Sequence, residues 1–391
     1  MTPASAPLER VAFAPDAAAG GADAALARDG AHAHALRVAR GRTSRLALRD
    51  ALATTVLLIA AVAAGSRGFR DVDRALLGYL VATVACAFAT TWRASAFWRR
   101  PASAFYARAL LASLREPRRL RRTVAAAGRD LAAQDFLRRR STARWVAHVL
   151  LSGGTLASFA ITLPLVFGWL RFAPAGDRSY RVALFGLPTA RFDVDGPIGW
   201  LLFHALALAG AAVLAGASAF LFARLRARRA PETVAASAIA PLVLLIVVAA
   251  SGLALPATRG LPALFPSAAA LHEAAVVALL VAIPFSKLGH VLVRPLQLGA
   301  RAVRSEDGAS WPSCGGCGAA LAPVAQRRVV EGILVAHGLP VARRSLRCPA
   351  CRRREVAAAQ ARLVGAHFQP RISGARPGGS GPASALSRRD G

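Results

Sequence analysis

Residues 271–298, LHEAAVVALLVAIPFSKLGHVLVRPLQL, decide how this chain is organised. The stretch is mostly apolar and holds His272 and His290, which lie eighteen residues apart. Eighteen residues make five turns of α-helix, so the spacing predicts one continuous helix with both imidazoles on one face, about 27 Å apart. The hydrocarbon core of a bilayer is roughly 30 Å thick, so we expect one histidine near each membrane surface.

The composition places the chain among multi-span membrane proteins. Of its 391 residues, 55% are hydrophobic, and the mean hydropathy is +0.43, which is high for a soluble domain. The formal net charge is +30. A nucleic-acid-binding protein can be equally basic, but here the arginines cluster between apolar segments. This arrangement indicates membrane topology rather than nucleic-acid binding.

The hydropathy pattern predicts an all-α integral membrane bundle of about six transmembrane helices. The expected spans are residues 46–64, 75–97, 145–170, 197–222, 234–255 and 271–298. The first is the weakest, and a helix on the membrane surface is its alternative. Residues 98–144 carry thirteen arginines against three acidic residues, which marks the cytoplasmic side. The other basic segments fall on the same side, so both termini are expected in the cytoplasm.

The chain divides into four expected parts. Residues 1–44, rich in Ala, Gly, Pro, Asp and Arg, are expected to form a disordered N-terminal tail. Residues 45–300 form the transmembrane domain, and residues 301–364 a small C-terminal module that resembles a zinc ribbon. Residues 365–391, rich in Pro, Gly and Ser, are expected to be a disordered tail.

Four histidines in the predicted spans form two couples at matched depth. Given the topology, His148 and His290 lie near the cytoplasmic face, and His204 and His272 lie near the outer face. Ionisable side chains inside a membrane usually mark function, and such couples suit the axial ligation of two stacked haems. The alternative is that they are polar residues solvated at the helix ends, or that His204 hydrogen-bonds a neighbouring helix.

Residues near the inner couple support the haem interpretation. Arg144 and Arg294 each lie four residues from one of these histidines and can meet haem propionates. Gly153 and Gly154 follow His148 by about a turn and a half and would let a flat macrocycle approach the helix backbone.

Four of the five cysteines predict a metal site in the C-terminal module. Cys314 and Cys317 form one C-x-x-C pair, and Cys348 and Cys351 form another. Four thiolates in two close pairs can surround one ion tetrahedrally. Zinc is the ordinary interpretation, and a redox iron as in rubredoxin is the alternative. The residues between the pairs alternate enough to predict two short strands and a turn.

The run of residues 283–290, IPFSKLGH, followed by Arg294 and Pro295, resembles the last-helix signature of a family of membrane b-type cytochromes. The family comprises the gamma subunit of respiratory nitrate reductase and related membrane subunits associated with heterodisulfide and sulfite reductases. The resemblance covers roughly residues 75–300. It implies axial ligation by His148, His272 and His290. The nitrate-reductase branch has a further histidine where this chain has Ser158, so the outer haem would depend on His204.

This resemblance implies a function. Family members oxidise quinol at the membrane and pass electrons through b haem to an iron–sulfur or catalytic partner on the cytoplasmic side. We therefore expect one haem b, or two, in a multi-pass protein of the bacterial inner membrane, with lipid and quinone but no nucleic acid as partners. The alternative function is a membrane-anchored zinc-ribbon adaptor without a redox role.

Lys287 is the only lysine of the chain. It precedes His290 by three residues, so a continuous helix would bury its cation beside the haem or quinol, where it would need a partner. The alternative is a side chain that snorkels to the membrane surface.

Overall fold

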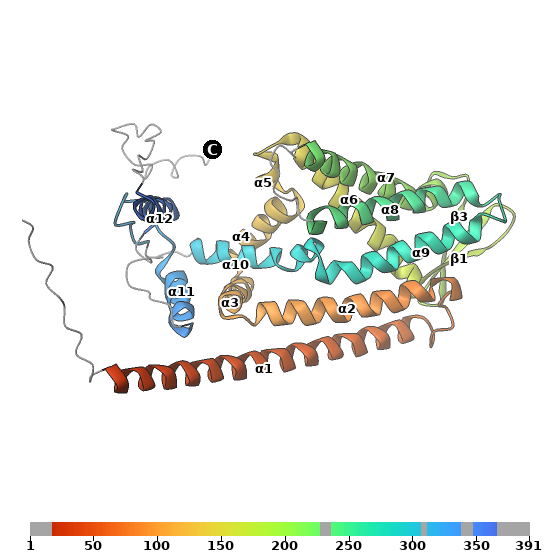
Figure 1. Ribbon diagram of the computed structural model, residues 1–391. Helices are drawn as coiled ribbons and strands as arrows, with labels where there is room; N and C mark the ends of the chain where they lie inside the picture. The colour runs from red at the N-terminus through yellow and green to blue at the C-terminus, as the bar shows by residue number, and fades with distance from the viewer. Residues whose placement is uncertain (1–17, 227–235, 306–310, 338–346, 366–391) are drawn as a thin grey trace, which may run out of the picture. The chain divides into compact units, whose positions relative to one another are not determined.

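The computed structural model describes residues 18–226, 236–305, 311–337 and 347–365 (Figure 1). The chain forms two units, residues 1–306 and residues 307–391. Each unit is described by itself.

The first unit is a helical bundle with six long apolar segments, as the hydropathy pattern predicts. The long helices are α1 (Ala18–Gly65), α2 (Leu77–Trp98), α6 (Thr142–Val166), α7 (Pro197–Arg226), α8 (Ala236–Thr258) and α9 (Phe265–Ala282). The segments long and apolar enough to cross a membrane are Gly41–Gly65, Arg74–Trp98, Thr142–Val166, Pro197–Arg226, Ile239–Thr258 and Phe265–Phe285. Helix α1 packs on α2, and α6, α7, α8 and α9 pack in succession; α9 also packs on α2 (Figure 1).

Helices α6 and α7 approach each other closely because glycines face their contact. A Cβ atom at Gly154 would lie 2.6 Å from the main-chain oxygen of Ala209, and one at Gly216 would lie 2.6 Å from that of Ala147. Gly154 therefore serves helix packing rather than the approach of a macrocycle. Gly153 is different, because a Cβ there would have nothing within 4 Å.

The predicted continuous helix over residues 271–298 is wrong. Helix α9 ends at Ala282 and is followed by two 3₁₀ segments, η3 (Ile283–Phe285) and η4 (Lys287–Leu292), and then by α10 (Arg294–Arg304). Pro284 cannot donate a helical hydrogen bond, and its ring crowds the preceding turn. Ser286 is extended, with φ −105° and ψ −177°, and its side chain caps η4. His272 and His290 therefore do not share one helix.

Short helices form a layer at one end of the long ones. These are α3 (Pro101–Arg115), α4 (Pro117–Ala127), the π-helix η2 (Gly128–Ala132) and α5 (Asp135–Arg138). The amphipathic helix α10 packs against α3 and α4 (Figure 1). An ion pair of 3.0 Å between Arg301 and Asp130 adds to this contact. The basic residues of the segment 98–144 thus lie in a compact helical layer.

A three-stranded antiparallel sheet lies at the opposite end of the bundle (Figure 1). Its strands are β1 (Leu170–Pro174), β2 (Ser179–Leu184) and β3 (Leu187–Asp193), in the order β1-β2-β3. Phe185 and Gly186 link β2 to β3 with φ of 51° and 79°, the signs of a type I′ hairpin turn. The sheet occupies the segment between two of the predicted spans, 145–170 and 197–222, for which the hydropathy pattern predicted no strands.

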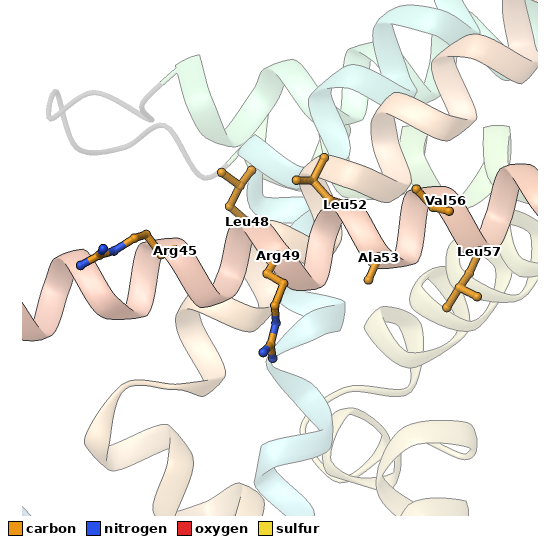
Figure 2. Close-up of a pocket in the computed structure, with 7 residues that line it drawn as sticks. All are labelled: Arg45, Leu48, Arg49, Leu52, Ala53, Val56 and Leu57. Atoms are coloured by element: carbon orange, nitrogen blue, oxygen red, sulfur yellow. The ribbon is translucent and has the colours of Figure 1, made fainter.

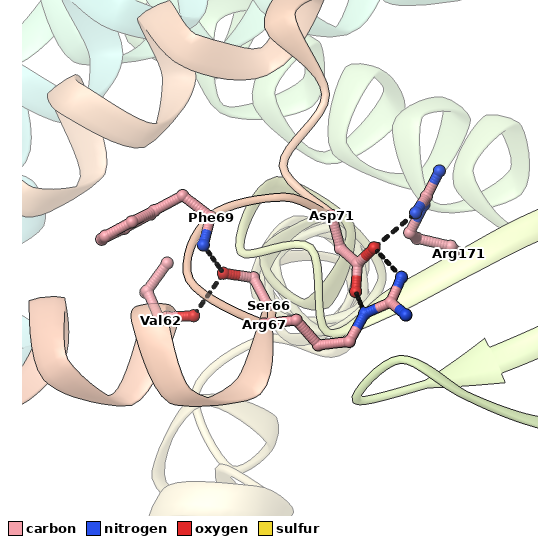
Figure 3. A network of polar contacts seen from close by, with 6 residues as sticks. All are labelled: Val62, Ser66, Arg67, Phe69, Asp71 and Arg171. Atoms are coloured by element: carbon pink, nitrogen blue, oxygen red, sulfur yellow. Dashed lines mark hydrogen bonds and ion pairs between the residues drawn. The ribbon is translucent and has the colours of Figure 1, made fainter.

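An ion-pair network ties the sheet to the turn between α1 and α2 (Figure 3). The Asp71 carboxylate, 1% exposed, pairs with Arg67 at 2.6 Å and with Arg171 of β1 at 2.5 Å. Ser66 donates to the main-chain oxygen of Val62 at 2.6 Å and accepts from the Phe69 amide at 3.1 Å. The network fixes a turn in which residues 67–69 all have positive φ.

The expected N-terminal tail is helical from Ala18 onward, because α1 begins there. Alanine-rich sequence has a high helix propensity, which competes with disorder. Residues 1–17 of the expected tail lie outside the described residues, as does the C-terminal tail from residue 366.

The C-terminal unit is helical where strands were expected. The prediction of strands is wrong for α11 (Val324–Ala336), and the remaining residues, 338–346, lie outside the described part of the chain. Val330, Ile333 and Leu334 recur at helical spacing, and Arg327 pairs with Glu331 four residues later at 3.1 Å. The second helix is α12 (Pro349–Leu363).

Candidate functional site

His148 and His290 lie within electrostatic range of each other although they are far apart in the sequence. His148 is on α6, and His290 is on η4. Their rings are within electrostatic range of each other, and Arg294 is within the same range of His148. These three residues thus lie near one another at the end of the bundle that carries the basic layer.

The His148 ring is held in an apolar setting. It is half-buried and meets the Phe220 ring of α7 edge-on, with centroids 6.1 Å apart. Its Nδ1 atom is buried and has no hydrogen-bond partner among the described residues. A buried polar atom without a hydrogen-bond partner is costly. The described residues therefore leave the hydrogen bonding of this site incomplete at His148 Nδ1.

The His290 ring is oriented by its own 3₁₀ segment. Its Nδ1 atom lies 2.7 Å from the main-chain oxygen of Lys287, which leaves Nε2 available. The ring is exposed. Beside it, the guanidinium of Arg294 lies over the Phe136 ring of α5, 4.6 Å from its centroid. Nothing in the sequence marks Phe136, because only the tertiary structure brings α5 to this place.

Lys287 does not occupy the buried position that a continuous helix would give it. It lies in η4, beyond the apolar segment that ends at Phe285, and it is exposed. Its main-chain oxygen, not its ammonium group, contacts His290. Because the Lys287 cation is not buried, it does not need a partner to offset a cost of burial.

The two histidines of the outer couple have separate partners. The His272 Nδ1 atom lies 3.0 Å from the Ser251 hydroxyl of α8. His204 is exposed, stacks on Trp200 with centroids 4.7 Å apart, and bonds the main-chain oxygen of that same residue at 2.8 Å. Helix α8 packs against both α7 and α9, the two helices that carry them. The outer haem site stays a prediction.

The four cysteines of the second unit form a candidate metal centre. The Sγ atoms of Cys314, Cys317, Cys348 and Cys351 all lie within 4.8 Å of one another. Tetrahedral zinc with Zn–S bonds of about 2.3 Å needs sulfur atoms about 3.8 Å apart, and the Sγ atoms of Cys317 and Cys348 are 3.6 Å apart. The donor set and its spacing therefore fit a single metal ion.

Main-chain amides around the sulfur atoms favour thiolates. The amides of Cys348 and Gly316 donate to Cys314 Sγ at 3.2 and 3.4 Å, and they lower the pKa of Cys314 to about 6. The Cys351 amide, in the first turn of α12, lowers the pKa of Cys348. Contacts with Cys317 and Cys348 raise the pKa of Cys351 to about 12. A cation would stabilise all four as thiolates.

Gly316 lies close to the cysteines, whereas His337 lies outside the cluster. A Cβ atom at Gly316 would collide with the Arg347 guanidinium and would lie 3.3 Å from Cys351 Sγ, so a larger residue there would displace the arginine side chain. His337 is exposed and bonds the main-chain oxygen of Ile333 in its own helix at 2.8 Å. The metal centre therefore consists of the four cysteines without this histidine.

A shallow, open groove runs along α1 and is lined entirely by that helix (Figure 2). Leu52, Val56 and Leu57 are 51%, 64% and 70% exposed. Arg45 and Arg49 lie toward one end. An apolar helix face with arginines at its end is typical of a surface in contact with lipid. The groove is thus an exposed apolar face of Gly41–Gly65, a segment long and apolar enough to cross a membrane.

Comparison with known proteins gives one family match. A model of the family described as citrate utilization protein B matches residues 202–310. The match runs from α7 through α10 and includes His204, His272 and His290, but neither His148 nor the cysteines. No curated protein and no solved structure matches the chain.

Proposed function

We propose that this protein is a membrane b-haem subunit that oxidises quinol and passes electrons to an iron–sulfur or catalytic partner on the cytoplasmic side. The observation that supports the proposal most is that His148 and His290, from distant parts of the chain, lie within electrostatic range of each other. Arg294 is within the same range of His148, at the basic end of the bundle.

The inner site has residues that suit haem. His148 and His290 would hold it, and because His290 uses Nδ1 for a main-chain contact, its Nε2 would be the ligating atom. Arg294, which lies within electrostatic range of His148, would pair with a propionate, and the open space at Gly153 leaves α6 accessible. Bound haem b supplies reversible one-electron transfer. The chain's own part is to orient both rings and to surround His148 with apolar side chains such as Phe220.

The membrane orientation follows from charge. The basic segments α3–α5 and α10 lie together at one end of the long helices, and the sheet lies at the other. By the excess of arginine, the basic end faces the cytoplasm of a bacterial inner membrane. His148 and His290 then lie on the side where a cytoplasmic partner accepts electrons.

The C-terminal unit has a structural role in this proposal. Four cysteine ligands without an open position are typical of a structural zinc site. An iron at the same ligands would instead make this unit an electron carrier. The description of the matched family, citrate utilization protein B, makes proteins of citrate utilization the first candidates for the partner.

A second candidate is a membrane-anchored zinc-ribbon adaptor without a redox role. The observation that favours it is the cysteine cluster, whose ligands are already gathered. It predicts a colourless protein that binds zinc alone.

The visible spectrum of the purified protein distinguishes the two candidates. We expect a dithionite-reduced α-band of a low-spin b haem, which His148→Ala or His290→Ala abolishes because both axial imidazoles are needed. His337→Ala is the matched control, since His337 is exposed in the other unit. A parental α-band in both site variants, or no haem in the parent, would contradict the proposal.

The haem count tests the outer couple. We expect one haem per chain, unchanged by His204→Ala, because the contacts of His204 and His272 are with Trp200 and Ser251. Two haems per chain, with about half lost in His204→Ala and in His272→Ala, would establish the outer site instead.

A further inference from the structure

Gln134 holds an uncommon conformation beside the inner site. It follows the π-helix η2, and its backbone has φ 53° and ψ 39°. Residues other than glycine rarely adopt this left-handed region. It is also only 9% exposed. Single turns of π-helix and strained backbone are both frequent at functional positions. Because glycine would relieve the strain, the glutamine side chain itself is the feature to explain.

Hydrogen bonds hold this segment along one face of α6. Trp145, His148 and Ser152 recur at helical spacing on that face. The Trp145 indole donates to the main-chain oxygen of Ala133 at 2.8 Å, and the Gln134 Nε2 atom lies 3.0 Å from the Ser152 hydroxyl. These two anchors lie on either side of His148. The Gln134 amide is therefore fixed against the strip of α6 that carries the His148 ring.

The Ser152 hydroxyl determines which way the amide points. It donates its single proton to the main-chain oxygen of His148 at 2.7 Å, so it can only accept from Gln134. The amide nitrogen of Gln134 must then face Ser152, and the Oε1 atom faces away from it. Among the described residues, this buried Oε1 has no hydrogen-bond donor, just as the His148 Nδ1 atom has no partner.

We propose that Gln134 is a positioning residue that sets the hydrogen bonding of His148 Nδ1, through a hydroxyl group that accepts from Nδ1–H and donates to Gln134 Oε1. A water molecule supplies this group, and one such bridge satisfies both orphaned atoms. The proposal rests on the proposed function, because a haem on Nε2 leaves Nδ1 protonated and in need of an acceptor. The acceptor strength at Nδ1 controls how basic the ligand is at the iron.

The bridge predicts midpoint-potential shifts of opposite sign in two variants. Gln134→Glu keeps the shape but adds a negative charge and a stronger acceptor, which favours ferric haem, so the midpoint potential falls. Gln134→Leu removes the acceptor and makes the imidazole a weaker ligand to ferric iron, so the potential rises. Ser152→Ala frees the amide and shifts the potential in the same direction as Gln134→Leu, by less.

The experiment measures haem content and midpoint potential of the full-length protein in membranes. Gln360→Leu, an exposed glutamine of α12, is the control and keeps the parental potential. Parental potentials in both Gln134 variants, or shifts of the same sign, overturn this inference and leave the proposed function standing. A parent without haem overturns both. If the Gln134→Leu protein does not accumulate in membranes, the other two variants test the inference: the midpoint potential should fall in Gln134→Glu and rise in Ser152→Ala.

Discussion

The Trp98 indole donates a hydrogen bond of 2.9 Å to the main-chain oxygen of Leu292, 194 positions further along the chain. Trp98 is the last residue of α2, and Leu292 is the last residue of η4, the segment that carries His290. A 3₁₀ segment has weaker hydrogen bonds than an α-helix, so an outside anchor has a large effect on its position. Trp98 therefore holds in place the segment that presents His290.

Trp98→Phe should loosen the binding of haem. The variant loses one hydrogen bond to η4, worth about 0.5–1.5 kcal/mol. The segment that carries His290 would then move more freely. We expect haem to leave the variant faster than the parent in a transfer assay to an apoglobin acceptor. Trp92→Phe, a change on the same helix at a side chain 38% exposed, is the control. Equal loss rates in the parent and Trp98→Phe would show that the anchor does not support the site.

Lys287→Arg and Lys287→Gln should both keep full haem, since the contact to His290 comes from the main chain. A compact ammonium differs from a planar guanidinium in size and donor geometry. We expect Lys287→Arg to slow haem reduction by a quinol analogue and Lys287→Gln to slow it further, as measured by stopped flow. Parental rates in both variants would identify Lys287 as a surface anchor alone.

The C-terminal unit should carry one metal ion per chain, with zinc expected. Cys348→Ser should remove most of it, because Cys348 supplies one ligand and also caps α12. Cys86→Ser, a change on α2 in the other unit, should leave the metal content unchanged. Elemental analysis of the full-length protein makes the measurement. Iron in excess of the haem content, lost together with a chromophore that bleaches on reduction in Cys348→Ser, would reverse the expectation.

Asp71→Asn should lower stability at neutral pH by about 1–3 kcal/mol, because it leaves two arginines without their carboxylate. Arg67 first, and then Arg171, hold the pKa of Asp71 below its usual value of 3.8. The stabilisation is thus complete above that value and is lost as the pH falls through the lower pKa of the folded state.

Thermal unfolding of the parent and of Asp71→Asn, measured across pH, tests this expectation. The difference between them should be constant near neutral pH and should shrink below about pH 4. Asp177→Asn, a change at an exposed carboxylate in the turn between β1 and β2, should match the parent throughout. A difference that stays the same down to pH 2 would contradict the assignment to the Asp71 charge.

The sequence by itself determined the properties that depend on composition and local spacing. Apolar stretches of bilayer length predict helices wherever they occur, so all six long apolar helices were found. Two C-x-x-C pairs predict a shared site because each pair already holds its sulfur atoms close, and the four cysteines do come together. The pairing of His148 with His290, which matched depth in the membrane suggests, stays a prediction.

Only the tertiary structure decided what depends on contacts between distant segments. Periodicity predicted one helix over residues 271–298, but Pro284 and Ser286 break it, and Trp98 then holds the segment that follows. Gln134 gives no signal in the sequence, because its importance comes from a left-handed backbone and burial against α6. Hydropathy reports the free energy of placing a segment in lipid, whereas the direction of a side chain near the bundle's end is set by packing partners far away in the chain.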